Sequence, residues 1–290
     1  MLGIDTWLRE RTGVIKDAGD ASGSARHAHA DVSFVGALRP VPILPLDAGQ
    51  GVYANLPAPA RTAQPQRARS RLGLPADAQV VLTCSALWQH RAYPRAAIRR
   101  LGAAFPRLLA ECLAPHARAH LVHVGPEAWP VGEVLGERYR ALPSLPPEAF
   151  GDLLAAADLF VSANASATTL VRAMGQGVPA LLVWQSEEPP QEPDPALRPY
   201  LPLPAYALWP LGWWRFLRPV LEDNAYVRAL DPVELTDLPA LRDRIARLLH
   251  DPQAARAQRE RQHDYLAALA RLPSGAEAID QALQDKGATL

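Results

Sequence analysis

The chain has 290 residues, 49% of them hydrophobic, so it is long enough to bury a substantial core in one large domain or two modest ones. Its 30 Lys and Arg residues balance its 30 Asp and Glu residues, which excludes an overall attraction to nucleic acid. Two cysteines without metal-site spacing are typical of buried thiols in a reducing compartment. Because no apolar run is long enough for a transmembrane segment and no signal peptide is evident, we expect a cytoplasmic protein.

The N-terminal part does not have the pattern of a self-sufficient domain. Residues 17–31 are rich in Ala, Gly, Ser and His without a helical or strand period, and residues 57–66 are typical of a linker. The stretch before the linker is shorter than a normal domain. We therefore interpret residues 1–66 as the remnant of an N-terminal domain plus a linker. The alternatives for this incomplete domain are a truncated gene product, a misassigned start, or a module that a partner chain completes.

From residue 67 onward, short apolar runs alternate with amphipathic stretches. The β-branched run at residues 79–84 predicts a buried strand, and the apolar spacing over residues 93–113 predicts a helix. The same reasoning predicts strands at residues 120–124, 139–142, 159–162 and 180–183, with helices around Phe150–Ala157 and over residues 167–175. Strands that alternate with helices form parallel sheets, so residues 67–232 are predicted to be an α/β, doubly wound, Rossmann-like domain.

The end of the chain has a different pattern. Its apolar spacing predicts consecutive helices over residues 238–249, 252–272 and 275–284. We therefore expect residues 233–290 to form a set of C-terminal helices that follow the sheet.

A turn rich in small and hydroxyl side chains follows the predicted strand at residues 159–162. Ser166, Thr168 and Thr169 stand at the start of the next predicted helix, where free backbone N–H groups and the helix dipole hold anions. These residues indicate a cradle for a diphosphate. Ser and Thr also cap ordinary helices, and the turn taken alone favours that role.

The loop after the first predicted strand is the second candidate site. In an open α/β sheet, this loop and the one after residue 162 flank the point where the strand order reverses, which is where ligands bind. There Ser85 would donate to a phosphate, and Trp88 would form a wall against a base or a sugar. The alternatives are core packing for Trp88 and a surface position for His90.

Other kinds of catalytic site are not indicated. The sequence shows no Ser-His-Asp arrangement, no Walker A loop and no G-x-G-x-x-G. His123 lies mid-strand among apolar residues and is interpreted as a buried structural histidine rather than a base. His27 and His29 have no third ligand nearby, so no metal site is predicted.

Three segments of the chain resemble the C-terminal, nucleotide-sugar-binding domain of GT-B glycosyltransferases. They are VVLTCSALWQ, HLVHVGPEAW and LPPEAFGDLLAAADLFVSANASATTLVRAMGQGVPALLV, all within about residues 67–190. The resemblance implies that this domain binds the donor, with the diphosphate on the helix that follows residue 167. The donor-binding residues it implies are Ser85, Trp88, Gln89, Gly125, Ser166, Thr168, Thr169, Arg172 and Gln185.

Arg172 departs from the pattern of that family. A carboxylate one turn into this helix usually holds the ribose, whereas an arginine cannot accept hydrogen bonds from ribose hydroxyls but can pair with phosphate. The sequence therefore leaves two functions open. One is transfer of a sugar from a nucleoside-diphosphate sugar to an acceptor, with no metal or other cofactor and with a catalytic base that the sequence does not identify. The other is a non-catalytic scaffold or regulatory subunit that kept the fold and lost the site.

Overall fold

The computed structural model describes residues 39–41, 52–54, 64–87, 90, 96–165, 167–186, 191–203, 221 and 224–284. The predictions for Trp88, Gln89 and Ser166 lie outside these residues. Within them, no helix is long and apolar enough to cross a membrane.

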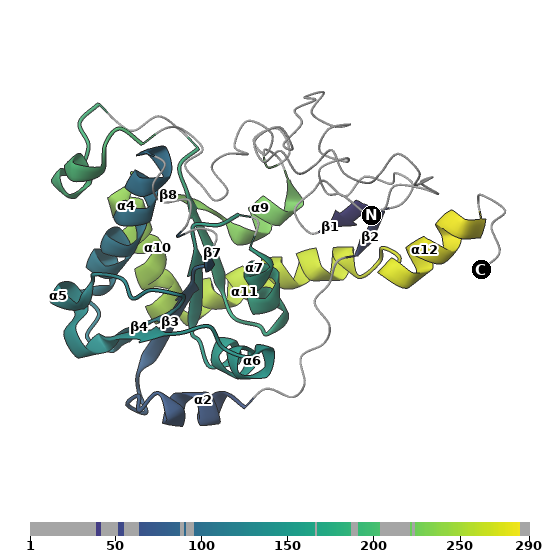
Figure 1. The fold of residues 1–290 in the computed structure, drawn as a ribbon, viewed down its shortest axis with the longest axis horizontal. Helices are drawn as coiled ribbons and strands as arrows, with labels where there is room; N and C mark the ends of the chain where they lie inside the picture. Colours follow the sequence, from purple (N-terminus) through teal and green to yellow (C-terminus); the bar gives the residue numbers. More distant parts are fainter. Residues whose placement is uncertain are drawn as a thin grey trace, which may run out of the picture.

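The main feature of the described residues is a six-stranded parallel sheet with the order β5-β4-β3-β6-β7-β8 (Figure 1). Its strands are β3 (Gln79–Cys84), β4 (Ala119–Val124), β5 (Tyr139–Leu142), β6 (Leu159–Ser162), β7 (Ala180–Trp184) and β8 (Val233–Glu234). The chain builds outward from β3 to β5 and then returns to add β6 on the other side of β3. The order therefore reverses between β3 and β6, where Val81 pairs with Leu159. This topology confirms the predicted doubly wound α/β sheet.

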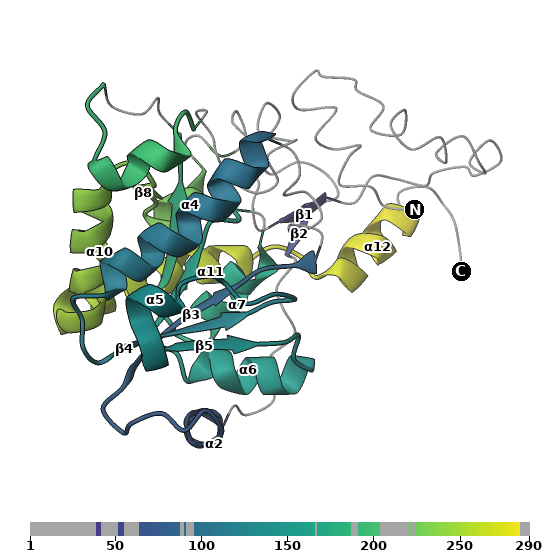
Figure 2. The same cartoon turned by 60° about the vertical axis from the view of Figure 1, so that its left-hand side comes forward.

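Helices cover both faces of the sheet (Figure 2). One face packs against α4 (Ala96–Leu113), α5 (Gly132–Leu135), the 3₁₀ helix η3 (Pro195–Tyr200) and α10 (Leu238–His250). The other packs against α2 (Pro65–Arg71), α6 (Pro147–Ala155), α7 (Thr168–Gly175), α9 (Ala225–Leu230) and α11 (Pro252–Leu269). Because side chains alternate along a strand, Val81 enters the first core and Leu82 the second, and both are fully buried.

The helix α7 ends sharply, as its Gly-x-Gly-x-Pro sequence predicts. Gly177 takes a φ of 69°, a left-handed conformation that glycine adopts without steric cost. The N–H of Gly177 donates to the carbonyl of Met174 at 2.9 Å, and that of Val178 donates to the carbonyl of Ala173 at 3.0 Å. The chain then returns directly into β7.

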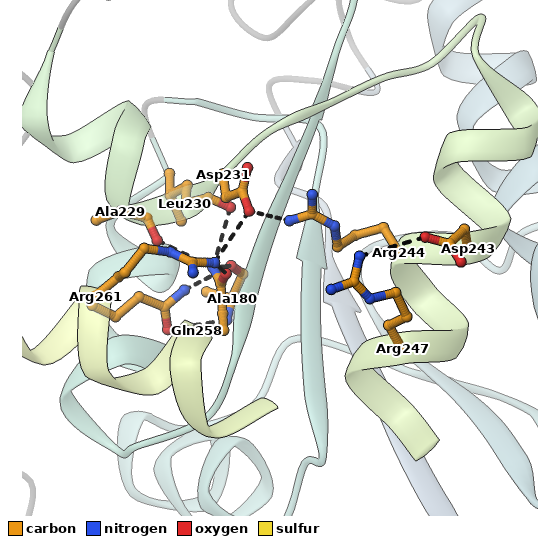
Figure 3. A network of polar contacts seen from close by, with 10 residues as sticks. Ala180, Ala229, Leu230, Asp231, Asp243, Arg244, Arg247, Gln258 and Arg261 are labelled. Atoms are coloured by element: carbon orange, nitrogen blue, oxygen red, sulfur yellow. Dashed lines mark hydrogen bonds and ion pairs between the residues drawn. The ribbon is translucent and has the colours of Figure 1, made fainter. Parts of the chain in front are cut away.

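Two buried glutamines of α11, Gln258 and Gln262, attach this helix to the sheet, and Figure 3 shows the contacts of Gln258. The side-chain N–H groups of Gln258 donate to the carbonyls of Ala180, Ala229 and Leu230 at 3.1, 3.1 and 3.3 Å. Gln262 brackets the backbone of Ala180, donating to its carbonyl at 2.8 Å and accepting from its N–H at 3.3 Å. These bonds join α11 to the first residue of β7 and to the end of α9.

The C-terminal helices are present as predicted. They are α10, α11 and α12 (Gly275–Gln284), and α12 lies beside a parallel pair of short strands, β1 (Arg39–Val41) and β2 (Val52–Ala54) (Figure 1). The strand β8, which the sequence analysis did not predict, adds a sixth strand beside β7. The division of the chain after residue 232 stays a prediction.

Candidate functional site

The carboxyl ends of β3 and β6 lie side by side at the point where the strand order reverses. In doubly wound sheets this edge, here called the carboxyl edge, forms the crevice that binds ligands. A small hollow lies at this edge; it is partly open to solvent and has about 10 Å³ of space, roughly enough for one water molecule. Its walls include Ser85, Leu101, Phe105, Trp129, Ser162 and Asn164.

Ser85, directly after β3, lies between two imidazole rings. Its Oγ is 2.8 Å from Nε2 of His90 and 2.7 Å from Nε2 of His123. On the far side of His90, Nδ1 lies 3.6 Å from Oε2 of Glu127. On the far side of His123, Nδ1 lies 3.5 Å from the hydroxyl of Tyr139. These five residues form one continuous polar row, here called the Ser85 row.

One assignment of protons gives each of the hydrogen bonds in the Ser85 row a donor and an acceptor. The hydroxyl of Tyr139 accepts the backbone N–H of Trp129 at 2.7 Å, so its own proton is available for Nδ1 of His123. A neutral His123 then carries its proton on Nε2 and donates it to Ser85. The hydroxyl of Ser85 has one proton, which is left for Nε2 of His90. His90 consequently holds its proton on Nδ1, toward the carboxylate of Glu127.

The surroundings of His123 keep it neutral. Its side chain is fully buried, and burial, with a smaller contribution from His90, lowers the pKa of His123 to about 4. Burial also raises the pKa of Tyr139, which keeps its hydroxyl protonated as a donor. Both shifts support the proton assignment above.

Gly125 allows Ser85 and His123 to meet. A Cβ on Gly125 would overlap Oγ of Ser85 and would lie 2.7 Å from Nε2 of His123, closer than real side chains pack. No other residue type fits this position without displacing the row. The predicted donor-binding role of Gly125 stays a prediction, while the contacts give it a packing role at the same edge.

Trp129 forms the wall of the hollow beside the row. Its ring stacks on His123 with 4.0 Å between ring centres, and it meets Phe105 edge-on at 5.7 Å. Its indole Nε1–H is buried and has no hydrogen-bond partner among the described residues. An unpaired buried donor costs about 1–3 kcal/mol, and an acceptor atom on a ligand would remove that cost.

The start of α7 borders the same edge. Ala167, the residue before the helix, is extended, and within the part of the chain that the structure describes no side chain caps the first turn of α7. Oγ1 of Thr169 lies 3.5 Å from Sγ of Cys84, the last residue of β3, whereas Thr168 is exposed. The N-terminus of α7 and the Ser85 row are therefore neighbours across the end of β3.

Two of the predicted donor-binding residues make other contacts. The guanidinium of Arg172 lies 5.4 Å from the centre of the Phe150 ring in α6. Gln185 is buried, and its Oε1 accepts from the backbone N–H of Thr236 at 3.0 Å and from the Thr236 hydroxyl at 2.7 Å. The structure thus gathers Ser85, Gly125 and Thr169 at the carboxyl edge, while Gln185 binds the turn after β8. Their roles toward a ligand stay predictions.

The sequence matches, over residues 2–287, a protein family described as a family of unknown function, DUF6365. The chain belongs to this family. No curated protein is significantly similar to it.

Several solved structures are similar in fold. WaaG, a glycosyltransferase involved in lipopolysaccharide biosynthesis, is 16% identical with a TM-score of 0.47, covering 83% of this chain and 55% of that one. Sucrose-phosphate synthase from Thermosynechococcus elongatus is 18% identical with a TM-score of 0.46, covering 78% and 49%. Spinosyn rhamnosyltransferase SpnG in complex with thymidine diphosphate is 17% identical with a TM-score of 0.46, covering 81% and 52%. The chain spans about half the length of these structures.

The structure also contains site residues that the sequence analysis missed. A surface position was the alternative considered for His90, whereas its side chain is only 6% exposed. A Ser-His-acid arrangement was not evident in the sequence, since its members come from loops after two different strands. One signal was available: His123, Gly125, Glu127 and Trp129 occur at every second position and would share a face of an extended chain. Among the described residues, no group of three His, Cys, Asp or Glu side chains is placed to hold a metal.

Proposed function

We propose that this domain binds a nucleoside-diphosphate sugar at the carboxyl edge and acts as the donor-binding part of a GT-B-type glycosyltransferase. The observation that carries the proposal is the start of α7, which no side chain of the described residues caps and which lies against the end of β3 at the reversal of strand order. A helix N-terminus at this position attracts a diphosphate through its backbone N–H groups and its dipole.

The residues of α7 have separate parts in this proposal. The backbone N–H groups of Thr168 and Thr169 would donate to phosphate oxygens, and their hydroxyls would add further hydrogen bonds. Arg172, one turn further along, would have to leave the Phe150 ring to reach a phosphate. The hydroxyl of Ser85 already donates to His90 in the proton assignment, so the phosphate would depend mainly on α7.

The reaction that follows from such binding is displacement at the anomeric carbon. The acceptor oxygen forms a bond to that carbon while the bond to the diphosphate breaks, and the leaving diphosphate takes the electron pair. Donors fixed at the start of α7 would stabilise the charge that develops on the diphosphate. The acceptor and its base would come from another domain or from a partner chain.

Calorimetric titration with UDP-, dTDP- and GDP-sugars tests the proposal. Thr168→Pro removes one backbone donor from the first position of α7, where proline is tolerated, and the extended backbone of Ala167 suits a residue before proline. We expect this variant and Thr169→Val each to weaken binding by about fivefold to tenfold, the scale of one hydrogen bond. The control is Ser274→Ala, whose hydroxyl accepts the Glu277 N–H at the start of α12, away from this edge.

The alternative is a non-catalytic scaffold. Arg172 favours it, because it stands where the resembled family has a carboxylate and because it packs over Phe150. A folded protein that binds none of the three nucleotide sugars would contradict the proposed function and leave the scaffold as the better interpretation.

A further inference from the structure

We propose that Ser85 is a nucleophile with His90 as its base, and that it accepts a short acyl group from an ester. This activity is separate from the nucleotide-sugar function and does not rest on it. It follows from three features of the carboxyl edge: the order of protons along the Ser85 row, the small hollow beside Ser85, and the unpaired N–H of Trp129.

The first feature is the direction of the hydrogen bonds. A serine hydroxyl becomes a nucleophile when an adjacent base accepts its proton and a third group orients that base. Nε2 of His90 lies 2.8 Å from Oγ of Ser85, and Oε2 of Glu127 lies 3.6 Å from Nδ1 of the same ring. The second distance is that of an ion pair, longer than a hydrogen bond, and Glu127 is largely exposed. Glu127 is therefore a positioning residue rather than a catalytic one.

His123 decides which imidazole is the base. In the proton assignment above, neutral His123 carries its proton on Nε2, so it donates to Oγ of Ser85 and does not accept from it. The proton of Ser85 is then directed to His90. The same N–H from His123 would stabilise the negative charge that grows on Oγ as this proton leaves.

The second feature is the hollow that Ser85 lines. Its other walls include the apolar side chains of Leu101, Phe105 and Trp129 as well as the polar Ser162 and Asn164, and it is partly open to solvent. Such mixed walls suit a group with one apolar and one polar end, as an acetyl group has. Because the hollow has room for about one water molecule, it takes at most the methyl end of that group, and the rest of the ester would lie in the open solvent.

The third feature is the indole Nε1–H of Trp129. It is buried without a partner among the described residues, and its ring lines the hollow and stacks on His123. The carbonyl oxygen of a bound ester would give this donor a partner. That bond would strengthen as the oxygen becomes negative during attack.

The two chemical steps balance without any other reagent than water. Oγ of Ser85 bonds to the carbonyl carbon as its proton passes to Nε2 of His90, and the ester bond breaks with that proton leaving on the alcohol. Water then attacks the acyl-serine, giving one proton to His90, which returns it to Ser85 as the carboxylic acid departs.

A fluorophosphonate probe tests the nucleophile directly. In this reaction Oγ bonds to phosphorus, fluoride leaves, and the hydroxyl proton passes to His90. We expect intact-mass analysis of the whole chain to show one adduct, and peptide mapping to place it on Ser85. No adduct on Ser85, under conditions that label a known serine hydrolase, would overturn the proposal. An adduct placed on Ser162 or another serine instead would overturn it equally. The assay contains no nucleotide, so its failure is distinct from a failure of the proposed function.

Substitutions in the Ser85 row distinguish the nucleophile, the base and the positioning residue by their labelling rates. Ser85→Ala should abolish labelling, and His90→Gln should slow it by about 100-fold or more, the scale of a lost general base. Glu127→Gln should slow labelling by about fivefold, the scale of an exposed ion pair, and Glu127→Asp should restore most of the rate. The matched control is Glu133→Gln, an exposed carboxylate on the neighbouring α5.

Turnover is measured with p-nitrophenyl acetate, whose acyl group is short and whose release is coloured. We expect a burst of p-nitrophenolate equal to the enzyme concentration, absent in Ser85→Ala. Equal rates for the two proteins would overturn the acyl-transfer assignment. Peptide mapping of the labelled wild-type chain needs no variant, so the proposal is tested even if a variant misfolds.

Discussion

The domain contains two buried polar networks that differ in one respect. In the network around Gln258 and Gln262, the nitrogen and oxygen of both side-chain amides are bonded to backbone or to Arg261, and we call it closed because no amide atom is left for a ligand. Beyond Arg261 it reaches Asp231 at the surface (Figure 3). The Ser85 row also ends at an exposed carboxylate, but it borders a hollow. A closed network without a ligand-facing atom fixes the position of a helix. An open one with titratable groups is where chemistry can occur.

The substitution with the largest predicted effect breaks the closed network. Gln258→Leu leaves the carbonyls of Ala180, Ala229 and Leu230 without their donor, so we expect the free energy of unfolding to fall by about 2–4 kcal/mol. Urea titration measures this change. Fluorophosphonate labelling of Ser85 in the folded variant should be unchanged.

The control for this prediction lies on the same helix. Gln253 is exposed, so Gln253→Leu should change the free energy of unfolding by less than about 0.5 kcal/mol. Similar losses for the two variants would show that the effect belongs to α11 in general and not to the buried network.

The second prediction concerns the dependence of stability on pH. The pKa of His123 is lowered from 6.5 to about 4 in the folded state, so below pH 6.5 the unfolded chain binds a proton that the folded chain does not. Stability should therefore be unaffected by His123 above this range and should fall as the pH decreases from 6.5 to about 4, by about 3 kcal/mol in total.

The variant His123→Gln isolates this contribution. The pKa values of His116 and His120 are also lowered by burial, so the wild-type chain loses stability at acid pH for more than one reason. The decrease between pH 6.5 and pH 4 should be smaller in His123→Gln by about 3 kcal/mol. Parallel curves for the two proteins would contradict the assignment of a neutral, buried His123.

The fold was accessible from sequence because it depends on local patterns. Apolar periodicity located β3, β5, β6 and α12 with the bounds that the structure has, and the alternation of strands with helices gave the doubly wound topology. The strand β8 was missed because two residues are too few to show a period.

The site was less accessible because it depends on contacts between distant residues. The turn before α7 was found, since hydroxyl residues at a helix start are a local signal. The Ser85 row was not, because Ser85 and His123 are 38 positions apart and meet only when β3 and β4 pair. Gly125 was predicted from the family resemblance. The steric requirement for glycine at this position is evident only from the positions of Ser85 and His123 in the structure.

The third prediction tests the steric requirement for glycine at position 125. Gly125→Ala places a methyl group against Oγ of Ser85 and Nε2 of His123, so overpacking should lower the free energy of unfolding by about 1–3 kcal/mol. Displacement of the row should also reduce fluorophosphonate labelling of Ser85 to the level of Ser85→Ala.

Gly132→Ala is the matched control for this substitution. Nothing lies within 4 Å of a Cβ at Gly132, so labelling should be retained. If Gly125→Ala were labelled as fast as the wild-type chain, the close packing of Gly125 against the Ser85 row would not be needed for the reactivity of Ser85.

The smallest predicted effect concerns Cys84, which is next to Ser85 and also lines the hollow. Burial raises the pKa of this thiol, and its contact with Thr169 is on the α7 side, so it is held as an unreactive thiol. Cys84→Ala should therefore change the labelling rate of Ser85 by less than about twofold. Iodoacetamide should leave Cys84 unmodified in the folded chain and should modify it in urea, as measured by intact mass. Rapid alkylation of Cys84 in the folded chain would mean that the carboxyl edge activates a thiol as well, and the reactivity of Ser85 could then not be attributed to His90 alone.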